Sequence, residues 1–128
     1  MNPHLDAWHR IIANKDWKAL GAMLAEDAQF HSPFAHTPKQ GRAAVQGVLA
    51  TVCDVFEDFQ YHRQWVDGGE WALEFSAKVS GLQLKGIDLV TLNDAGMITR
   101  FEVLIRPANA LQALGAEMGR RLAAMGID

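Results

Sequence analysis

The sequence predicts one α+β domain in which helices cover one face of a curved antiparallel sheet. Over residues 3–59, apolar residues recur at helical spacing around one short strand. From residue 71 the period changes to two, because apolar and polar residues alternate as they do in a half-buried strand. Helices and strands therefore occupy separate parts of the chain, and this segregation favours an α+β fold with an antiparallel sheet.

The first part of the chain carries start signals for its helices. Asn2 and Pro3 supply an N-cap and a proline at the first helical position, and Asp16 caps a second, shorter helix. An apolar stripe follows Gly41 in the pattern of an amphipathic helix. The elements predicted here are helices over residues 3–13, 17–24 and 41–59, a strand over residues 28–32 and a loop over residues 33–40.

The second part is predicted to be a strand meander that ends in a helix. A turn at residues 80–81 and a short loop at residues 93–96 separate segments with a period of two. Pro107 then begins a last helix, which ends at Gly126. The predicted strands cover residues 61–66, 71–79, 82–92 and 97–106.

The composition restricts the classes of partner and compartment. The 128 residues fit a single domain, and 12 Lys and Arg against 15 Asp and Glu argue against a nucleic-acid partner. Cys53 is the single cysteine, so no disulfide framework or cysteine-based metal site is predicted. No apolar stretch is long enough to span a bilayer, and no signal peptide is evident. We therefore expect a cytoplasmic protein without a membrane partner.

Asp88 is the first candidate for chemistry. In the segment LQLKGIDLVTL it shares a face with Leu82, Leu84 and Val90, so its carboxylate is predicted to point toward the core. A buried carboxylate is costly unless it has hydrogen-bond donors or a raised pKa. A tryptophan N–H, a histidine or Arg106 would satisfy it structurally, and a register shift of one residue would place it in water. The functional alternative is an acid or base in a pocket.

Two His-Xaa-Pro triplets, His31-Ser32-Pro33 and His36-Thr37-Pro38, repeat five residues apart in the predicted loop. The prolines fix the backbone of a turn, but a turn does not need the histidines. With Asp88, the two imidazoles form a permissive pattern for a metal, and we expect no metal here. Capping of turns is the structural role open to them, and proton transfer near neutral pH is the functional one. His31, His36 and Asp88 are the candidate catalytic residues.

Several motifs resemble the nuclear transport factor 2-like superfamily, in its SnoaL-like (polyketide cyclase-like) and ketosteroid isomerase-like branch. LAEDAQFHSPFAHTP followed by GRAAV looks like the first strand, loop and third helix of that branch. GIDLVTLNDAGMITRFEVLIRPANAL looks like its last hairpin and closing helix. The run HSPFAHTPKQG, with the later IRP, looks like one uncharacterised bacterial subgroup. Because the resemblance covers nearly the whole chain, residues 1–128 are expected to form a single SnoaL-like domain.

The resemblance also implies the shape of the domain. It implies a strongly bent antiparallel sheet that forms a cone-shaped half-barrel, the cystatin-like α+β barrel, with helices over the concave face. The loop that carries the histidines would lie at the cavity. Members commonly form homodimers through the outer sheet face, to which Ile87 and Leu89 would contribute. The residues expected to bind substrate are Ser32, Phe34, Trp8, Trp71, Phe75 and Phe101.

The enzymes of this superfamily are matched only in part. Ketosteroid isomerases resembling this chain carry their base in an Asp-Pro step after the first strand, where this sequence has Ser32-Pro33. The Arg/Asp network of limonene epoxide hydrolases has no clear counterpart, since Val103 occupies one acidic position. Asp88 is then the carboxylate that would replace them.

The sequence thus predicts a small-molecule pocket protein of SnoaL-like type. As an enzyme, it would be an isomerase, cyclase or dehydratase acting on a small, apolar, oxygenated ligand by general acid–base chemistry, without a metal or an organic cofactor. One alternative is a non-catalytic small-molecule binding protein. A second is a protein–protein adaptor, which a substantial exposed apolar patch outside the dimer face would favour.

Overall fold

The computed structural model describes residues 2–126 of the chain. Its helices are α1 (Pro3–Asn14), α2 (Trp17–Met23), α3 (Arg42–Val55) and α4 (Ala108–Ala124). Its strands are β1 (Leu24–His31), β2 (Lys39–Gln40), β3 (Glu57–Asp67), β4 (Glu70–Val79), β5 (Leu82–Leu92) and β6 (Ile98–Arg106). None of these helices has the length and apolarity to cross a membrane.

The helix starts follow the predicted caps, whereas several element boundaries differ from the prediction. The side chains of Asn2 and Asp16 accept hydrogen bonds from backbone N–H groups at the starts of α1 and α2. The loop predicted over residues 33–40 contains the short strand β2, and β3 is longer at both ends than the strand predicted over residues 61–66. β1 begins at Leu24, in the stretch predicted to end the second helix. The third helix ends at Val55 instead of residue 59, because Phe56 is extended and Asp58 adopts a φ of 53°. The helical spacing of the later phenylalanines was therefore misleading.

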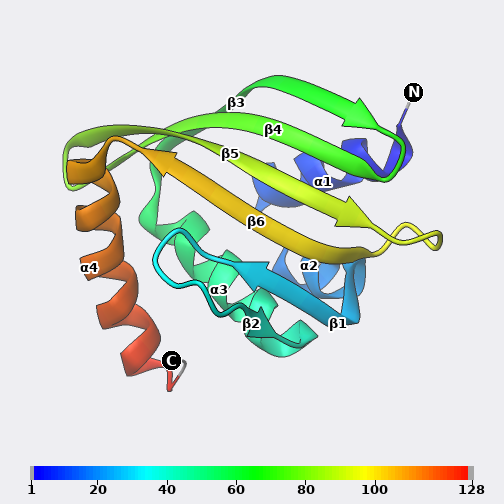
Figure 1. Cartoon of the computed structure of the whole chain (residues 1–128), viewed down its shortest axis with the longest axis horizontal. Helices are drawn as coiled ribbons and strands as arrows, with labels where there is room; N and C mark the ends of the chain where they lie inside the picture. Colours follow the sequence, from blue (N-terminus) through cyan, green and yellow to red (C-terminus); the bar gives the residue numbers. More distant parts are fainter. Residues whose placement is uncertain (1, 127–128) are drawn as a thin grey trace.

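The six strands form one open, mixed sheet in the order β2-β1-β6-β5-β4-β3. Every pairing is antiparallel except that of β1 with β6, which is parallel. Figure 1 shows α1, α2 and α3 on one side of the curved sheet and α4 standing at one end of it. The predicted α+β class is confirmed, but the predicted antiparallel sheet is in fact mixed, because β1 pairs with β6 in parallel.

Side-chain alternation sets which residues face the helices. Leu73 pairs with Asp88, and Phe75 pairs with Gly86, so these inward positions of β4 and β5 lie side by side. A Cβ on Gly86 would lie 2.8 Å from the carbonyl oxygen of Leu104 and would collide with the Phe75 ring, so glycine leaves room for that ring. The largest fully buried side chains include Trp8, Phe75, Leu20, Leu24, Leu73 and Ile98.

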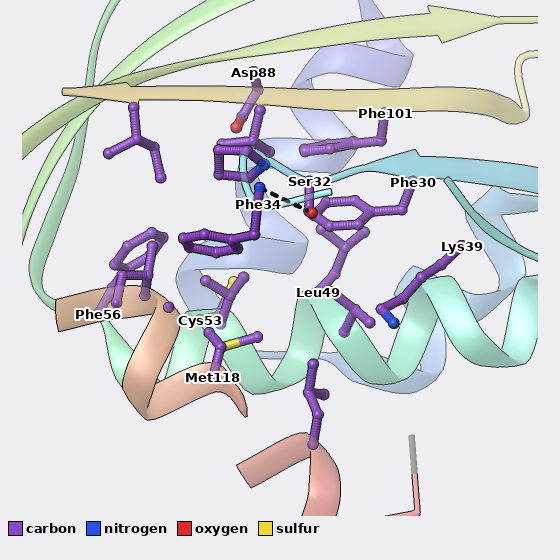
Figure 2. Close-up of a pocket in the computed structure, with 18 of the residues that line it drawn as sticks. Phe30, Ser32, Phe34, Lys39, Leu49, Cys53, Phe56, Asp88, Phe101 and Met118 are labelled. Atoms are coloured by element: carbon purple, nitrogen blue, oxygen red, sulfur yellow. Dashed lines mark hydrogen bonds between the residues drawn. The ribbon is translucent and has the colours of Figure 1, made fainter. Parts of the chain in front are cut away.

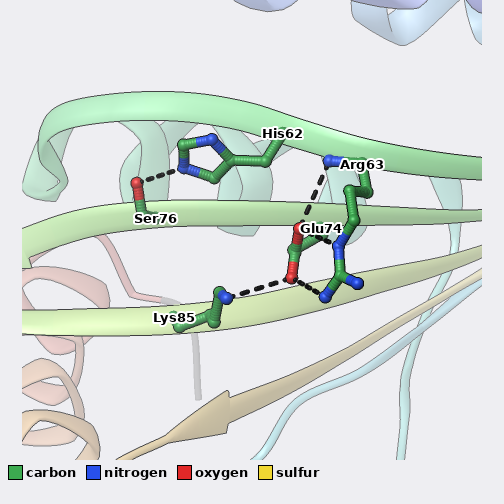
Figure 3. A network of polar contacts seen from close by, with 5 residues as sticks. All are labelled: His62, Arg63, Glu74, Ser76 and Lys85. Atoms are coloured by element: carbon green, nitrogen blue, oxygen red, sulfur yellow. Dashed lines mark hydrogen bonds and ion pairs between the residues drawn. The ribbon is translucent and has the colours of Figure 1, made fainter.

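The outer face of the sheet carries a polar network around Glu74. The Arg63 guanidinium donates hydrogen bonds of 2.9 and 2.7 Å to the two carboxylate oxygens, and Lys85 Nζ lies 3.1 Å from one of them (Figure 3). The register of β3 against β4 shifts between Tyr61 and Gln64. One extra residue enters β3 at this bulge, so the consecutive residues His62 and Arg63 both face outward. His62 contacts Ser76 and Arg63 contacts Glu74 (Figure 3).

Candidate functional site

A cavity of about 280 Å³ lies between the concave face of the sheet, α3 and α4. Aromatic rings make up much of its wall, and Figure 2 shows several of them gathered around one space. Phe59 and Phe75 stack with ring centroids 5.2 Å apart, and Phe56 lies 5.6 Å from each of them. The lining is therefore largely apolar, as is usual for sites that bind small organic molecules.

Asp88 enters this cavity from the middle of β5. Leu84, Gly86, Asp88 and Val90 are all buried, whereas the residues between them are more exposed. The predicted inward orientation of Asp88 is thus confirmed, and its side chain retains only 5% exposure. Its carboxylate is the single acidic group in the cavity lining formed by the described residues.

Tyr61 is the hydrogen-bond partner of Asp88. Its hydroxyl donates to Asp88 Oδ2 at 2.8 Å, and it accepts a hydrogen bond of 3.0 Å from the indole N–H of Trp8. Because the indole only donates, the chain of hydrogen bonds runs in one direction, from Trp8 through Tyr61 to Asp88. Oδ1 of Asp88 accepts no hydrogen bond from residues 2–126. Every fully buried side-chain nitrogen or oxygen in these residues has a hydrogen-bond partner, so Oδ1 is not fully buried. This oxygen therefore has access to the cavity.

Burial and hydrogen bonding act on the Asp88 carboxyl in opposite directions. Burial raises its pKa and the hydrogen bond from Tyr61 offsets part of that rise, so that the pKa shifts from 3.8 to about 7. Burial and the nearby Asp88 charge raise the pKa of Tyr61 well above 10, so the phenol remains protonated. Burial likewise raises the pKa of Cys53, which also lines the cavity, to about 12. Asp88 is therefore the group here that exchanges a proton near neutral pH.

The SnoaL-like domain model matches residues 5–101, which is most of the chain. The chain belongs to the SnoaL-like family. It is 50% identical to a steroid delta-isomerase from Pseudomonas aeruginosa, with a TM-score of 0.92 over 96% of this chain and 91% of that one. It is 39% identical to an uncharacterised bacterial protein with a cystatin-like fold from Silicibacter pomeroyi DSS-3, with a TM-score of 0.91 over 96% and 87%.

More distant structures share the fold of this SnoaL-like domain. A nuclear transport factor 2-like protein of unknown function from Mesorhizobium loti aligns with a TM-score of 0.73 at 15% identity, over 82% of this chain and 89% of that one. No curated protein matches the sequence at a significant level. The predicted family and the cystatin-like α+β fold are confirmed.

The two candidate histidines, His31 and His36, do not join Asp88. Phe30 points into the cavity, so strand alternation turns its neighbour His31 outward, where His31 Nε2 lies 3.2 Å from Gln29 Oε1. His36 is exposed, and both imidazoles border a separate open depression instead of the cavity. The expected cluster of His31, His36 and Asp88 is therefore absent from the structure.

Five of the six side chains expected to bind substrate line the cavity. These are Ser32, Phe34, Trp8, Phe75 and Phe101. Trp71 does not line it, because it is buried in the hydrophobic core outside the cavity wall.

Sequence reasoning missed Tyr61 and Lys39 as cavity residues. Tyr61 is the only tyrosine in the chain, and in β3 it stands two residues after Phe59, which the prediction had placed in the third helix. This spacing indicates a shared face and was the available signal for Tyr61. Lys39 carried no such signal, because its strand β2 has two residues.

Proposed function

We propose that this SnoaL-like domain catalyses an acid–base isomerisation of a small, apolar, oxygenated substrate, with Asp88 as the group that carries the proton. The single observation behind this proposal is a carboxyl group with a pKa of about 7 and a cavity-facing oxygen, set in a largely apolar wall. A carboxyl with this pKa accepts and returns a proton with little penalty at neutral pH. The similarity to a steroid delta-isomerase supports the same class of reaction.

The proposed reaction needs two proton transfers. The Asp88 carboxylate first takes a proton from the carbon beside a ketone, so a C–H bond breaks, an O–H bond forms and the electron pair passes into a dienolate. Asp88 then returns the proton to the carbon two positions away, which moves the double bond into conjugation and restores the carboxylate. Tyr61 acts as a positioning residue, because its hydrogen bond fixes Oδ2 and leaves Oδ1 toward the substrate.

A β,γ-unsaturated ketosteroid is the first substrate to test, and ultraviolet absorbance of the conjugated product follows the reaction. We expect turnover by the wild type and a loss of about 100-fold or more in kcat for Asp88→Asn. Asp94→Asn, the same substitution at an exposed position in the β5–β6 loop, is the matched control. Full turnover by Asp88→Asn would remove this carboxyl from the mechanism.

A non-catalytic binding protein is the alternative that the apolar cavity also favours. In that case Asp88 and Tyr61 serve only to hold a polar atom of the ligand. The wild type would then bind the ketosteroid without exchanging its acidic hydrogens for deuterium in D₂O, as nuclear magnetic resonance would show.

We further propose that two copies pack through their outer sheet faces. Large apolar side chains stand exposed there, with Trp65 and Leu104 each at 49% exposure. Ile87 pairs with Leu104, so the apolar surface continues across β5 and β6. Light scattering should give a dimer mass for the wild type and a monomer mass for Leu104→Glu, and a monomeric wild type would refute this assembly.

A further inference from the structure

Lys39 is held on the cavity side of the sheet by its strand pairing. β2 pairs with β1 so that Lys39 stands directly opposite Phe30, and cross-strand partners share a face. Phe30 is buried against the cavity, and Lys39 lines the same cavity. Figure 2 shows the Lys39 side chain extending toward Leu49 on α3. An ammonium group is thereby presented to an apolar space.

Lys39 has no counter-charge within the described structure. The lysine ion pairs between residues 2 and 126 involve Lys15, Lys78 and Lys85, and none involves Lys39. Among the cavity-lining residues that the structure describes, Lys39 is the only base and Asp88 the only acid. Three strand-to-strand steps separate β2 from β5, or about 14 Å along the sheet. The backbones that carry these two charged groups therefore lie far enough apart to contact different ends of one molecule.

Two hydroxyl groups accompany the ammonium group. Ser32 and Thr37 also line the cavity, and both lie in the loop that joins β1 to β2. Ser32 stands two residues after Phe30, and Thr37 stands two residues before Lys39, the residue paired with Phe30. Ser32 Oγ accepts the backbone N–H groups of Phe34 and Ala35 at 3.2 and 3.3 Å. Both of its accepting positions are thus engaged, and its own hydrogen, which has no acceptor among residues 2–126, can be donated to a ligand.

We propose that the ligand of this cavity carries a carboxylate at the end opposite its reacting carbon, and that Lys39, Ser32 and Thr37 bind this carboxylate. The ammonium supplies the charge, and the hydroxyls supply donors for the two carboxylate oxygens. One cation with two hydroxyls matches the charge of a carboxylate better than that of a phosphate, which carries closer to two charges. The position of the reacting carbon rests on the proposed function, whereas the recognition of the carboxylate does not.

Matched pairs of ligands test this proposal on the full chain. The probes are 4-phenylbutyrate, 6-phenylhexanoate and 8-phenyloctanoate, each compared with its primary amide by isothermal titration calorimetry. We expect at least one carboxylate to bind about fivefold more tightly than its amide, as for a charged contact near a surface. Lys39→Met should abolish that preference and Lys39→Arg should retain it. Lys18→Met, at an exposed position of α2, is the matched control and should change nothing.

Three results would overturn the proposal: equal affinity for acid and amide, a preference that survives in Lys39→Met, or no binding of any of the three carboxylates. The alternative role of Lys39 is to discourage the edge strand β2 from pairing with other chains. If Lys39 has that role alone, the acid and its amide should bind with equal affinity. The variant Asp88→Asn separates this proposal from the proposed function. It should keep the carboxylate preference, whether or not the wild type isomerises a ketone.

Discussion

The hydroxyl of Tyr61 donates a hydrogen bond of 2.8 Å to the Asp88 carboxylate, although 27 positions separate the two residues in the chain. β4 lies between their strands in the sheet, where Tyr61 pairs with Phe75 and Asp88 pairs with Leu73, so the two side chains meet across the concave side of β4. This contact makes Asp88 a partly satisfied acid instead of an isolated buried charge. Several properties of the protein that can be measured depend on it.

The variant Tyr61→Phe should raise the pKa of Asp88 above its value of about 7. The hydrogen bond favours the charged carboxylate, so its loss favours the protonated form, and we expect a rise of about one unit. A titration of the ¹³C-labelled aspartate carboxyl by nuclear magnetic resonance measures this pKa. An unchanged or lower pKa would mean that Tyr61 does not stabilise the charge.

The free energy of unfolding should decrease as the pH rises from about 4 to about 7. Asp88 ionises near 3.8 in the unfolded chain and near 7 in the folded one, so the folded state binds more protons in this window. The stability is fully present below pH 4, and up to roughly 4 kcal/mol is lost as the buried carboxyl ionises. Urea unfolding across this pH range measures the slope, and Asp88→Asn should remove it.

Glu74 should produce the opposite pH dependence at lower pH. The hydrogen bonds from Arg63 and then Lys85 hold the pKa of Glu74 well below its usual range of about 4.5. The stability that this network contributes is present above that value and is lost as the pH falls and the carboxylate protonates. Glu74→Gln should therefore flatten the acid limb of the unfolding curve. Glu26→Gln, at an exposed position of β1, is the control and should leave it unchanged.

Two glycines one turn apart in α4 should respond differently to alanine. A Cβ on Gly119 would meet nothing within 4 Å, so Gly119→Ala should stabilise the helix by about 0.5–1 kcal/mol. A Cβ on Gly115 would lie 2.9 Å from Cε1 of Phe34, a residue that lines the cavity. Gly115→Ala should therefore gain less stability, or lose some, because the Phe34 ring must shift.

A double-mutant cycle in urea checks the cause of that difference. If Phe34 limits Gly115→Ala, adding Phe34→Ala should restore the gain seen at Gly119. Additive effects of the Gly115 and Phe34 substitutions would show that the ring is not responsible.

Local periodicity predicted much of the fold and the inward direction of Asp88. A period of two has only two outcomes, inward or outward, and the surrounding Leu84 and Val90 decide between them. Helix starts were likewise predictable, because a cap is a contact between residues three positions apart. Phe56 and Phe59 were wrongly placed in the third helix, because residues three positions apart share one face of a helix. In the structure Phe56 is extended and Phe59 lies in β3.

The sequence by itself determined the α+β class, the family and the buried carboxylate, because each depends on patterns between near neighbours. Only the tertiary structure decided that Tyr61 binds this carboxylate, that the histidines lie outside the cavity and that Lys39 faces into it. Each of these depends on which strands lie side by side and in which register. Strand order and register are set by the packing of the whole sheet against its helices, and no short segment of the chain contains that information.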